Sequence, residues 1–198
     1  MGYVAFFKTK IRALHVTLPK SINGMTPKYS RQLSYGANNV VIDLSETEVG
    51  KLFTGDTRSD IGSEAEKMRF ANGVNELVVR FNRLDRNETL QADMLVMERL
   101  YPIDFRTYEI EMREIWCDLF TEQLAELYTA GFVHHNLKRP TGLPGLPYDN
   151  ILLTLTGLRL IDVGISVLKY QVGQRVFDAY VQRELDELAE FRDYFITR

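Results

Sequence analysis

The sequence predicts an α+β fold, with an antiparallel sheet and one helix in its first half and long helices in its second half. Short apolar runs rich in strand-forming residues, separated by turn residues, recur through residues 29–97. Two stretches with apolar residues at helical spacing follow, at residues 112–130 and 174–195. Between them, two short apolar runs joined by Thr156-Gly157 predict a β-hairpin.

The composition is that of an ordinary soluble domain, with 45% hydrophobic and 26% charged residues in 198. A net charge of −3 gives no general attraction to nucleic acid or anionic lipid. The single Cys117 excludes a disulfide framework, and no apolar run is long enough for a signal peptide or a membrane span. We therefore expect a cytoplasmic protein without nucleic-acid or membrane partners, and the sequence leaves its oligomeric state open.

In chain order, residues 1–28 are expected to be an N-terminal extension without an assigned function. Five strands are expected next, at residues 32–35, 40–44, 49–53, 77–81 and 94–97. A helix is expected at residues 59–72, because Ile61, Ala65 and Met68 fall on one stripe. These segments predict a five-stranded antiparallel sheet that carries one helix.

Two charged residues in this first half occur where apolar residues are expected. Lys51 interrupts the apolar strand Val49-Gly50-Lys51-Leu52-Phe53, and Glu64 lies on the same helical stripe as Ile61 and Met68. A carboxylate on an apolar face is costly unless a cation meets it. The sequence therefore predicts an ion pair between Lys51 and Glu64. The alternative for Lys51 is an edge-strand lysine that points into solvent.

Polar residues also flank the predicted hairpin. Asn150 precedes its first apolar run and Asp162 follows its second. One strand of an antiparallel pair starts where its partner ends, so the hairpin brings Asn150 and Asp162 to one mouth. Amide and carboxylate oxygens there are suited to Mg²⁺ that carries a polyphosphate.

The stretch from Gly131 to Gly164 resembles the catalytic core of protein kinases, where H-R-D-L-K-x-x-N precedes a hairpin that ends in D-F-G. Here His134-His135-Asn136-Leu137-Lys138 stands for the first motif, Asn150 for its terminal Asn, and Asp162-Val163-Gly164 for the second. Two departures matter. Asn136 occupies the position of the catalytic Asp, and residues 139–148 lengthen the loop before Asn150.

The resemblance extends over about residues 29–198 and implies a bilobal kinase-like fold. It implies an N-lobe at residues 29–97, a hinge at 98–104 and a truncated, mainly helical C-lobe at 105–198. A full kinase has a long activation segment and several further helices after its second motif. Here residues 165–172 are only a short connection to the last predicted helix.

The resemblance also implies ATP and Mg²⁺ as cofactors and assigns residues to them. Gly36 would cover the phosphates, Lys51 paired with Glu64 would position them, and Asn150 and Asp162 would hold the metal. Met97 would lie at the back of the adenine slot, the backbones of Glu98 and Leu100 would face the base edge, and Asp104 would lie near the ribose. Asn136 and Lys138 take the catalytic-loop positions, and His134 is expected to brace that loop through a backbone hydrogen bond.

The departure at Asn136 separates the functional alternatives. An amide can accept a hydrogen bond from a substrate hydroxyl but cannot take up its proton. General-base catalysis contributes on the order of 10²–10⁴ in rate, so its loss predicts a slow phosphotransferase acting on a hydroxyl, with a protein as the expected substrate. Asp149 and Asp104 are nearby carboxylates that could substitute for the base. The alternative is a pseudokinase that binds nucleotide or a partner protein, and a third hypothesis is an unrelated α+β domain.

Overall fold

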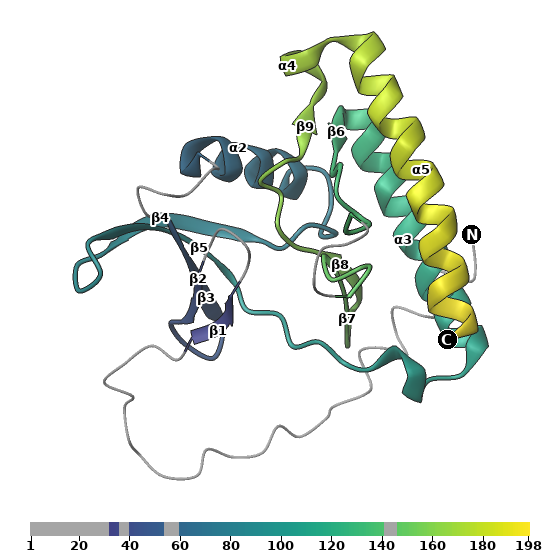
Figure 1. The fold of residues 1–198 in the computed structure, drawn as a ribbon, viewed down its shortest axis with the longest axis horizontal. Helices are drawn as coiled ribbons and strands as arrows, with labels where there is room; N and C mark the ends of the chain where they lie inside the picture. The colour runs from purple at the N-terminus through teal and green to yellow at the C-terminus, as the bar shows by residue number, and fades with distance from the viewer. Residues whose placement is uncertain (1–31, 36–39, 54–59, 141–145) are drawn as a thin grey trace. The chain divides into compact units, whose positions relative to one another are not determined.

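The computed structural model describes residues 32–35, 40–53, 60–140 and 146–198, all within the compact unit Arg31–Arg198. This part of the chain is α+β, with an antiparallel sheet and helices (Figure 1). The predicted Gly36 and the extension at residues 1–28 lie outside the described residues. None of the described helices is both long enough and apolar enough to cross a bilayer.

The sheet has the strand order β1-β2-β3-β5-β4, and each neighbouring pair is antiparallel. Its strands are β1 (Gln32–Tyr35), β2 (Val40–Asp43), β3 (Glu48–Phe53), β4 (Phe81–Asn87) and β5 (Ala92–Glu98). Lys51 pairs with Leu95 in the register of β3 with β5. Both strand neighbours of β3 are present, so Lys51 lies inside the sheet rather than on its edge.

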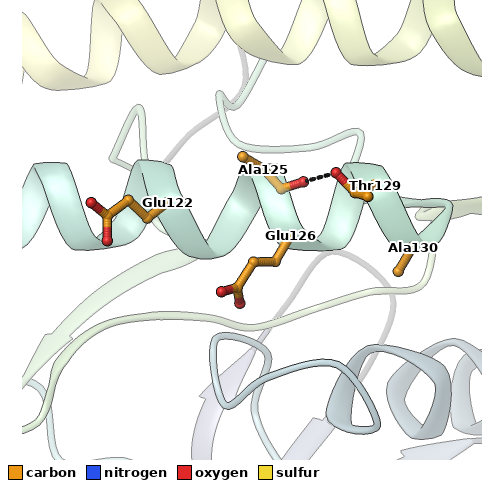
Figure 2. Close-up of a pocket in the computed structure, with 5 residues that line it drawn as sticks. All are labelled: Glu122, Ala125, Glu126, Thr129 and Ala130. Carbon is orange, nitrogen blue, oxygen red and sulfur yellow. Dashed lines mark hydrogen bonds between the residues drawn. The ribbon is translucent and has the colours of Figure 1, made fainter. Parts of the chain in front are cut away.

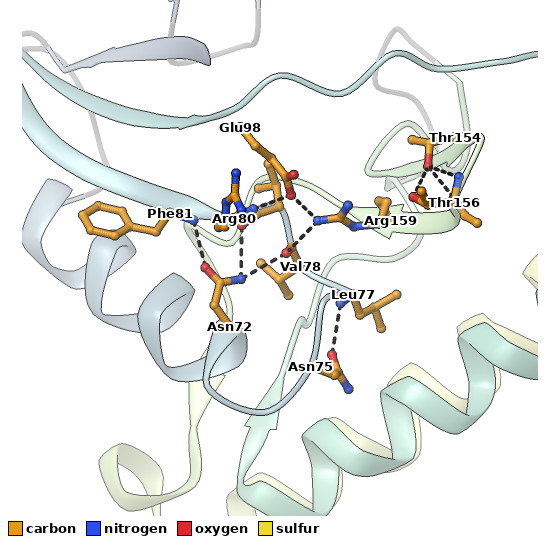
Figure 3. A network of polar contacts seen from close by, with 12 residues as sticks. Asn72, Asn75, Leu77, Val78, Arg80, Phe81, Glu98, Thr154, Thr156 and Arg159 are labelled. Carbon is orange, nitrogen blue, oxygen red and sulfur yellow. Dashed lines mark hydrogen bonds and ion pairs between the residues drawn. The ribbon is translucent and has the colours of Figure 1, made fainter. Parts of the chain in front are cut away.

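The fourth strand differs from the prediction, because residues 77–80 are not part of the sheet and β4 begins at Phe81. The side chain of Asn72 forms hydrogen bonds with this part of the backbone. Its amide nitrogen donates to Val78 O at 3.1 Å, and its oxygen accepts from Phe81 N at 2.8 Å. Residues 77–79 instead join the later hairpin, with Leu160 N donating to Leu77 O and Val79 N donating to Leu160 O, both at 2.8 Å. Figure 3 shows the contacts of Asn72 with Val78 and Phe81.

The helix α2 (Ile61–Asn72) begins immediately after Asp60, whose carboxylate accepts from Ser63 N at 2.7 Å as an N-cap. Ala65 and Met68 are fully buried, as the predicted stripe requires. Lys67 does not belong to the predicted stripe, but it is only 8% exposed. The buried face of α2 is therefore wider than the predicted stripe and includes a second charged residue.

The second half is dominated by α3 (Ile110–Ala130) and α5 (Gln174–Thr197), which lie side by side (Figure 1). Phe191 and Phe195 of α5 join Phe120 of α3 in the main core, with Tyr148 from the loop. The helix α3 ends at Gly131, whose φ of 102° suits a glycine C-cap. Cys117 is buried in this core, which raises the pKa of its thiol to about 11 and agrees with a packing role.

Short elements connect these helices. The 3₁₀ turn η1 (Phe105–Thr107) precedes α3, and β6 (Phe132–Val133) follows it and pairs with β9 (Val167–Leu168). The hairpin is β7 (Ile151–Thr154) with β8 (Gly157–Leu160), as predicted. The helix α4 (Lys169–Val172) links β9 to α5. The loop at residues 134–140 follows β6, and the turn at residues 162–166 precedes β9. Because β6 and β9 pair, the start of this loop and the end of this turn lie next to each other.

Candidate functional site

The ammonium of Lys51 contacts two carboxylates that come from other parts of the chain. Its ammonium donates to Glu64 Oε1 at 2.7 Å and to Asp162 Oδ1 at 2.8 Å. The predicted Lys51–Glu64 ion pair is confirmed, and the same ammonium also reaches the end of the hairpin. Lys51 and Glu64 are 5% and 2% exposed, whereas the side chain of Asp162 is 53% exposed. The cluster is therefore buried on two sides and open to solvent at Asp162.

Burial and charge shift the pKa values of this cluster in different directions. Burial alone would lower the pKa of Lys51, but attraction to Asp162 and Glu64 outweighs it and the pKa is raised. Burial raises the pKa of Glu64 more than Lys51 lowers it. For Asp162, attraction to Lys51 overcomes the opposing effect of burial, and its pKa is lowered. At neutral pH the site therefore holds a charged lysine against an ionised Asp162.

The mouth of the hairpin brings Asn150 and Asp162 to one end, as predicted. Ile151 pairs with Leu160, and Ile161 N donates to Asn150 O at 3.0 Å. The side-chain nitrogen of Asn150 donates to Asn136 O at 2.9 Å, which turns this amide toward the segment at residues 134–138. Among the described residues, no donor contacts the side-chain oxygen of Asn150.

These residues fit the requirements of Mg²⁺, although the described residues contain no group of three or more His, Cys, Asp or Glu side chains that could hold a metal alone. Mg²⁺ usually binds through one or two carboxylates together with waters and substrate phosphates. The half-exposed carboxylate of Asp162 and the amide oxygen of Asn150 are ligands of this kind. Such a site would be completed by a polyphosphate rather than by further protein ligands.

The backbone at Asp162 is unusual, with φ of 59° in the left-handed region. A residue other than glycine in this region costs on the order of 1–3 kcal/mol and persists only where its surroundings hold it there. His134 is fully buried, and its Nε2 lies 2.9 Å from Ile161 O. The prediction that His134 braces the loop through the backbone is confirmed. This brace holds the residue immediately before the strained turn.

Glu184 of α5 anchors the same loop. Its carboxylate is 1% exposed and accepts from His134 N at 3.2 Å, from His135 N and from the hydroxyl of Tyr128 at 3.1 Å. Burial raises the pKa of Glu184 to about 7. Asp186 instead accepts from Gln182 on the exposed face of α5. The anchor is therefore a buried carboxylate that is satisfied by uncharged donors.

Lys138 and the nearby carboxylates are engaged elsewhere. Lys138, expected in the catalytic loop, directs its ammonium to Glu190 of α5, and its backbone N–H donates to Glu187 at 3.2 Å. Asp149 forms an ion pair with Arg139. Asp104 accepts from Arg106 Nε at 2.9 Å and caps the turn η1. Neither carboxylate is a free replacement for a base at Asn136.

The predicted hinge needs correction at Glu98, while the role predicted for Leu100 stays a prediction. The backbone N–H of Glu98 donates to Arg80 O at 2.9 Å, so it is not available to a base edge. Its carboxylate binds Arg159 of β8 and accepts from Arg80 N at 2.7 Å (Figure 3). Within the described residues, the backbone of Leu100 forms no hydrogen bond. Met97 packs against the main core.

Two surface hollows lie away from these residues. The larger, about 520 Å³, is lined by Glu122, Ala125, Glu126, Thr129 and Ala130 along one face of α3 (Figure 2). The other, about 390 Å³, lies where Phe70 of α2, the end of α3 and α4 meet. Neither hollow includes a residue that the sequence assigned to nucleotide or metal. The candidate site is therefore defined by its converging charges rather than by these hollows.

Sequence reasoning missed Lys67 and Glu184 as buried charges. Glu184 lies seven residues after Phe177 and four before Leu188, so its place on the apolar stripe of α5 was readable from the sequence. Lys67 follows Glu64 by three residues, which places both on neighbouring positions of one helix face.

No protein-family model matches the chain, and no curated protein matches it significantly.

Proposed function

We propose that the chain is a kinase-like phosphotransferase that binds Mg-ATP and moves its γ-phosphate to a hydroxyl group, with a protein as the expected substrate. The observation that carries the proposal is the contact of one buried ammonium, Lys51, with both Glu64 and Asp162. Phosphoryl transfer depends mainly on positioning and on charge stabilisation. A lysine held by one carboxylate next to a second, half-exposed carboxylate meets both needs.

In this proposal each residue has a separate task. Glu64 holds Lys51, whose ammonium binds phosphate oxygens, while Asp162 and Asn150 bind Mg²⁺, which neutralises charge on the phosphates when bound. Asn136 accepts a hydrogen bond from the substrate hydroxyl through its side-chain oxygen. The proposed bilobal kinase-like arrangement has the sheet and α2 on one side of this cluster and the hairpin with α3 and α5 on the other. The backbone of Leu100 remains the candidate contact for the base.

The second candidate is a pseudokinase, a module that binds nucleotide or a partner protein without efficient transfer. Asn136 at the position of the base favours it, and so does the ion pair of Lys138 with Glu190, which turns this lysine toward α5. The two candidates share the same nucleotide site. They differ in whether the bound γ-phosphate is transferred.

Transfer of radiolabelled γ-phosphate from ATP to the protein itself and to general protein substrates separates the candidates. The phosphotransferase proposal predicts slow incorporation that is lost in Lys51→Met. Asn136→Asp restores a base and should increase the rate by about 10²–10⁴ if the loss of the base is the limiting defect. Absence of transfer in both the native protein and Asn136→Asp, with Mg-ATP bound, would leave the pseudokinase as the function.

A further inference from the structure

A second buried lysine lies beside the candidate site without a carboxylate partner. Lys67 is 8% exposed, and its ammonium donates to the backbone carbonyl of Gly164 at 2.8 Å. Within the described residues, no carboxylate forms an ion pair with Lys67. Burial lowers its pKa, although Glu64 and Glu66 act in the opposite direction. An ammonium in such a place is costly, so its position calls for a compensating role.

The carbonyl that Lys67 holds belongs to the strained turn at Asp162. Gly164 follows Asp162 by two residues, and Asp162 has φ of 59°. Ser166 N closes the turn on Val163 O at 3.0 Å. Lys67 therefore fixes a carbonyl inside the turn, two residues after the carboxylate that we assign to Mg²⁺.

The same helix face connects the turn to the rest of the site. Glu64, one turn before Lys67 on α2, binds Lys51, which in turn binds Asp162. The neighbouring Glu66 accepts from the hydroxyl of Tyr170 on α4 at 2.5 Å. Lys51 thus contacts the side chain of Asp162, and Lys67 contacts the backbone of the same turn. Both lysines depend on α2: Lys67 belongs to this helix, and Lys51 is bound by Glu64 of this helix.

We propose that Lys67 is a positioning residue for Asp162: by binding the carbonyl of Gly164, it keeps the left-handed turn in the conformation that presents Asp162 to Mg²⁺. The inference rests on the proposed nucleotide-binding function. Lys67 itself contacts neither the metal nor the nucleotide in this proposal. Its loss should therefore weaken the part of nucleotide binding that depends on the metal and leave the remaining part unchanged.

Titration calorimetry of ATP, once with excess Mg²⁺ and once with EDTA, tests this selectivity. Lys67→Met keeps the length of the side chain and removes the ammonium; we expect Mg-ATP to bind about tenfold or more weakly, as for other residues that orient metal ligands. Binding in EDTA should stay within about twofold, a difference of less than 1 kcal/mol. Lys67→Arg, which retains a cationic donor, should recover most of the affinity. The exposed Lys169 of α4 provides the matched control Lys169→Met, with no change expected.

An equal loss of affinity with Mg²⁺ and with EDTA would show a merely structural role and overturn the proposal, as would unchanged binding of Mg-ATP. If Lys67→Met does not fold, Lys67→Gln replaces it, because the shorter side chain does not bring a charge to Gly164. The same selective loss is required of that variant.

Hydrogen exchange without nucleotide tests Lys67 independently of the proposed function. The amide of Ser166, which donates to Val163 O across the turn, should exchange about tenfold faster in Lys67→Met, a change equivalent to about 1.4 kcal/mol. Amides in the middle of α3 should keep their protection. Unchanged protection at Ser166 would overturn the inference. If the native protein binds no nucleotide, the proposed function fails, yet this measurement still decides whether Lys67 holds the turn.

Discussion

At the residue scale, Lys51 has the largest electrostatic effect, because two carboxylates depend on one ammonium. Glu64 is the more dependent of the two. It is 2% exposed, and its Oε2 is buried without a hydrogen-bond partner. Removing the ammonium leaves this buried carboxylate uncompensated, while the half-exposed Asp162 can recover water contacts.

Lys51→Met should lower the free energy of unfolding by about 3 kcal/mol at pH 7, in the range for breaking a buried ion pair. The loss should be smaller at pH 5, because Glu64, whose pKa is already raised by burial, can be protonated in the variant. Urea unfolding at both pH values measures the difference. Lys138→Met, which breaks the partly exposed pair with Glu190, should cost less than about 1 kcal/mol. A similar loss in both variants would contradict the assignment of Lys51 as a buried structural cation.

Glu184 gives stability a separate pH dependence. Its folded pKa of about 7 lies above the ordinary value of 4.5. The stabilising contribution of its protonated form is therefore present below about pH 4.5 and is lost as the pH rises through about 7. Glu187 raises this pKa further, while burial lowers the pKa values of the neighbouring His134 and His135.

Glu184→Gln cannot ionise, so its stability should not fall with this titration. The stability of the variant relative to the native protein should rise by about 2–3 kcal/mol between pH 5 and pH 8. Urea unfolding of both proteins across this range provides the test, and the comparison cancels the shared contribution of the histidines. Parallel stability curves would show that Glu184 titrates normally and is not buried as described.

At the element scale, α2 does more than cover the sheet. Its side chains bind Lys51 through Glu64, Gly164 through Lys67 and α4 through Glu66. Its C-terminal residue Asn72 holds the backbone of residues 78–81. The helix therefore connects the sheet, the hairpin and the turn at Asp162.

Asn72→Ala should destabilise the protein by about 1–3 kcal/mol, because it leaves the N–H of Phe81 and the carbonyl of Val78 without the partner they have now. Asn87→Ala is the matched control. Asn87 accepts a single exposed hydrogen bond, from Leu90 N at 2.9 Å, and its loss should cost less than about 1 kcal/mol. Thermal unfolding of both variants measures the contrast. Equal stability of Asn72→Ala and the native protein would argue against a stabilising role for these two hydrogen bonds of Asn72.

The elements also show why prediction succeeded in some places and not in others. The hairpin and the Lys51–Glu64 pair follow from local patterns: two apolar runs with a Thr-Gly turn, and charges at fixed spacing on apolar faces. The start of β4 does not, because it depends on a side-chain bridge from Asn72 and on backbone pairing with Leu160, which is distant in the sequence. The occupied N–H of Glu98 and the pairing of Lys138 with Glu190 likewise depend on partners that a local pattern cannot identify.

At the scale of the whole described unit, the site is assembled from three separated segments: β3, α2 and the end of the hairpin. The α+β class and the order of strands and long helices could be predicted from periodicity alone. That Asp162 reaches Lys51 across 111 positions of sequence could be expected only from the kinase resemblance. The kinase-like bilobal arrangement and its cofactors remain proposals that rest on this convergence.

Binding of Mg-ATP, followed by thermal unfolding of the native protein and of Asp162→Ala, tests the central claim most directly. At about 100 times its dissociation constant, a ligand stabilises by about 2.7 kcal/mol, which for a chain of this size raises Tm by about 5–10 °C. We predict such a rise in the native protein and in the surface control Asp118→Ala, and none in Asp162→Ala. An unchanged Tm of the native protein at saturating Mg-ATP would contradict the claim that Lys51, Glu64 and Asp162 form a nucleotide site.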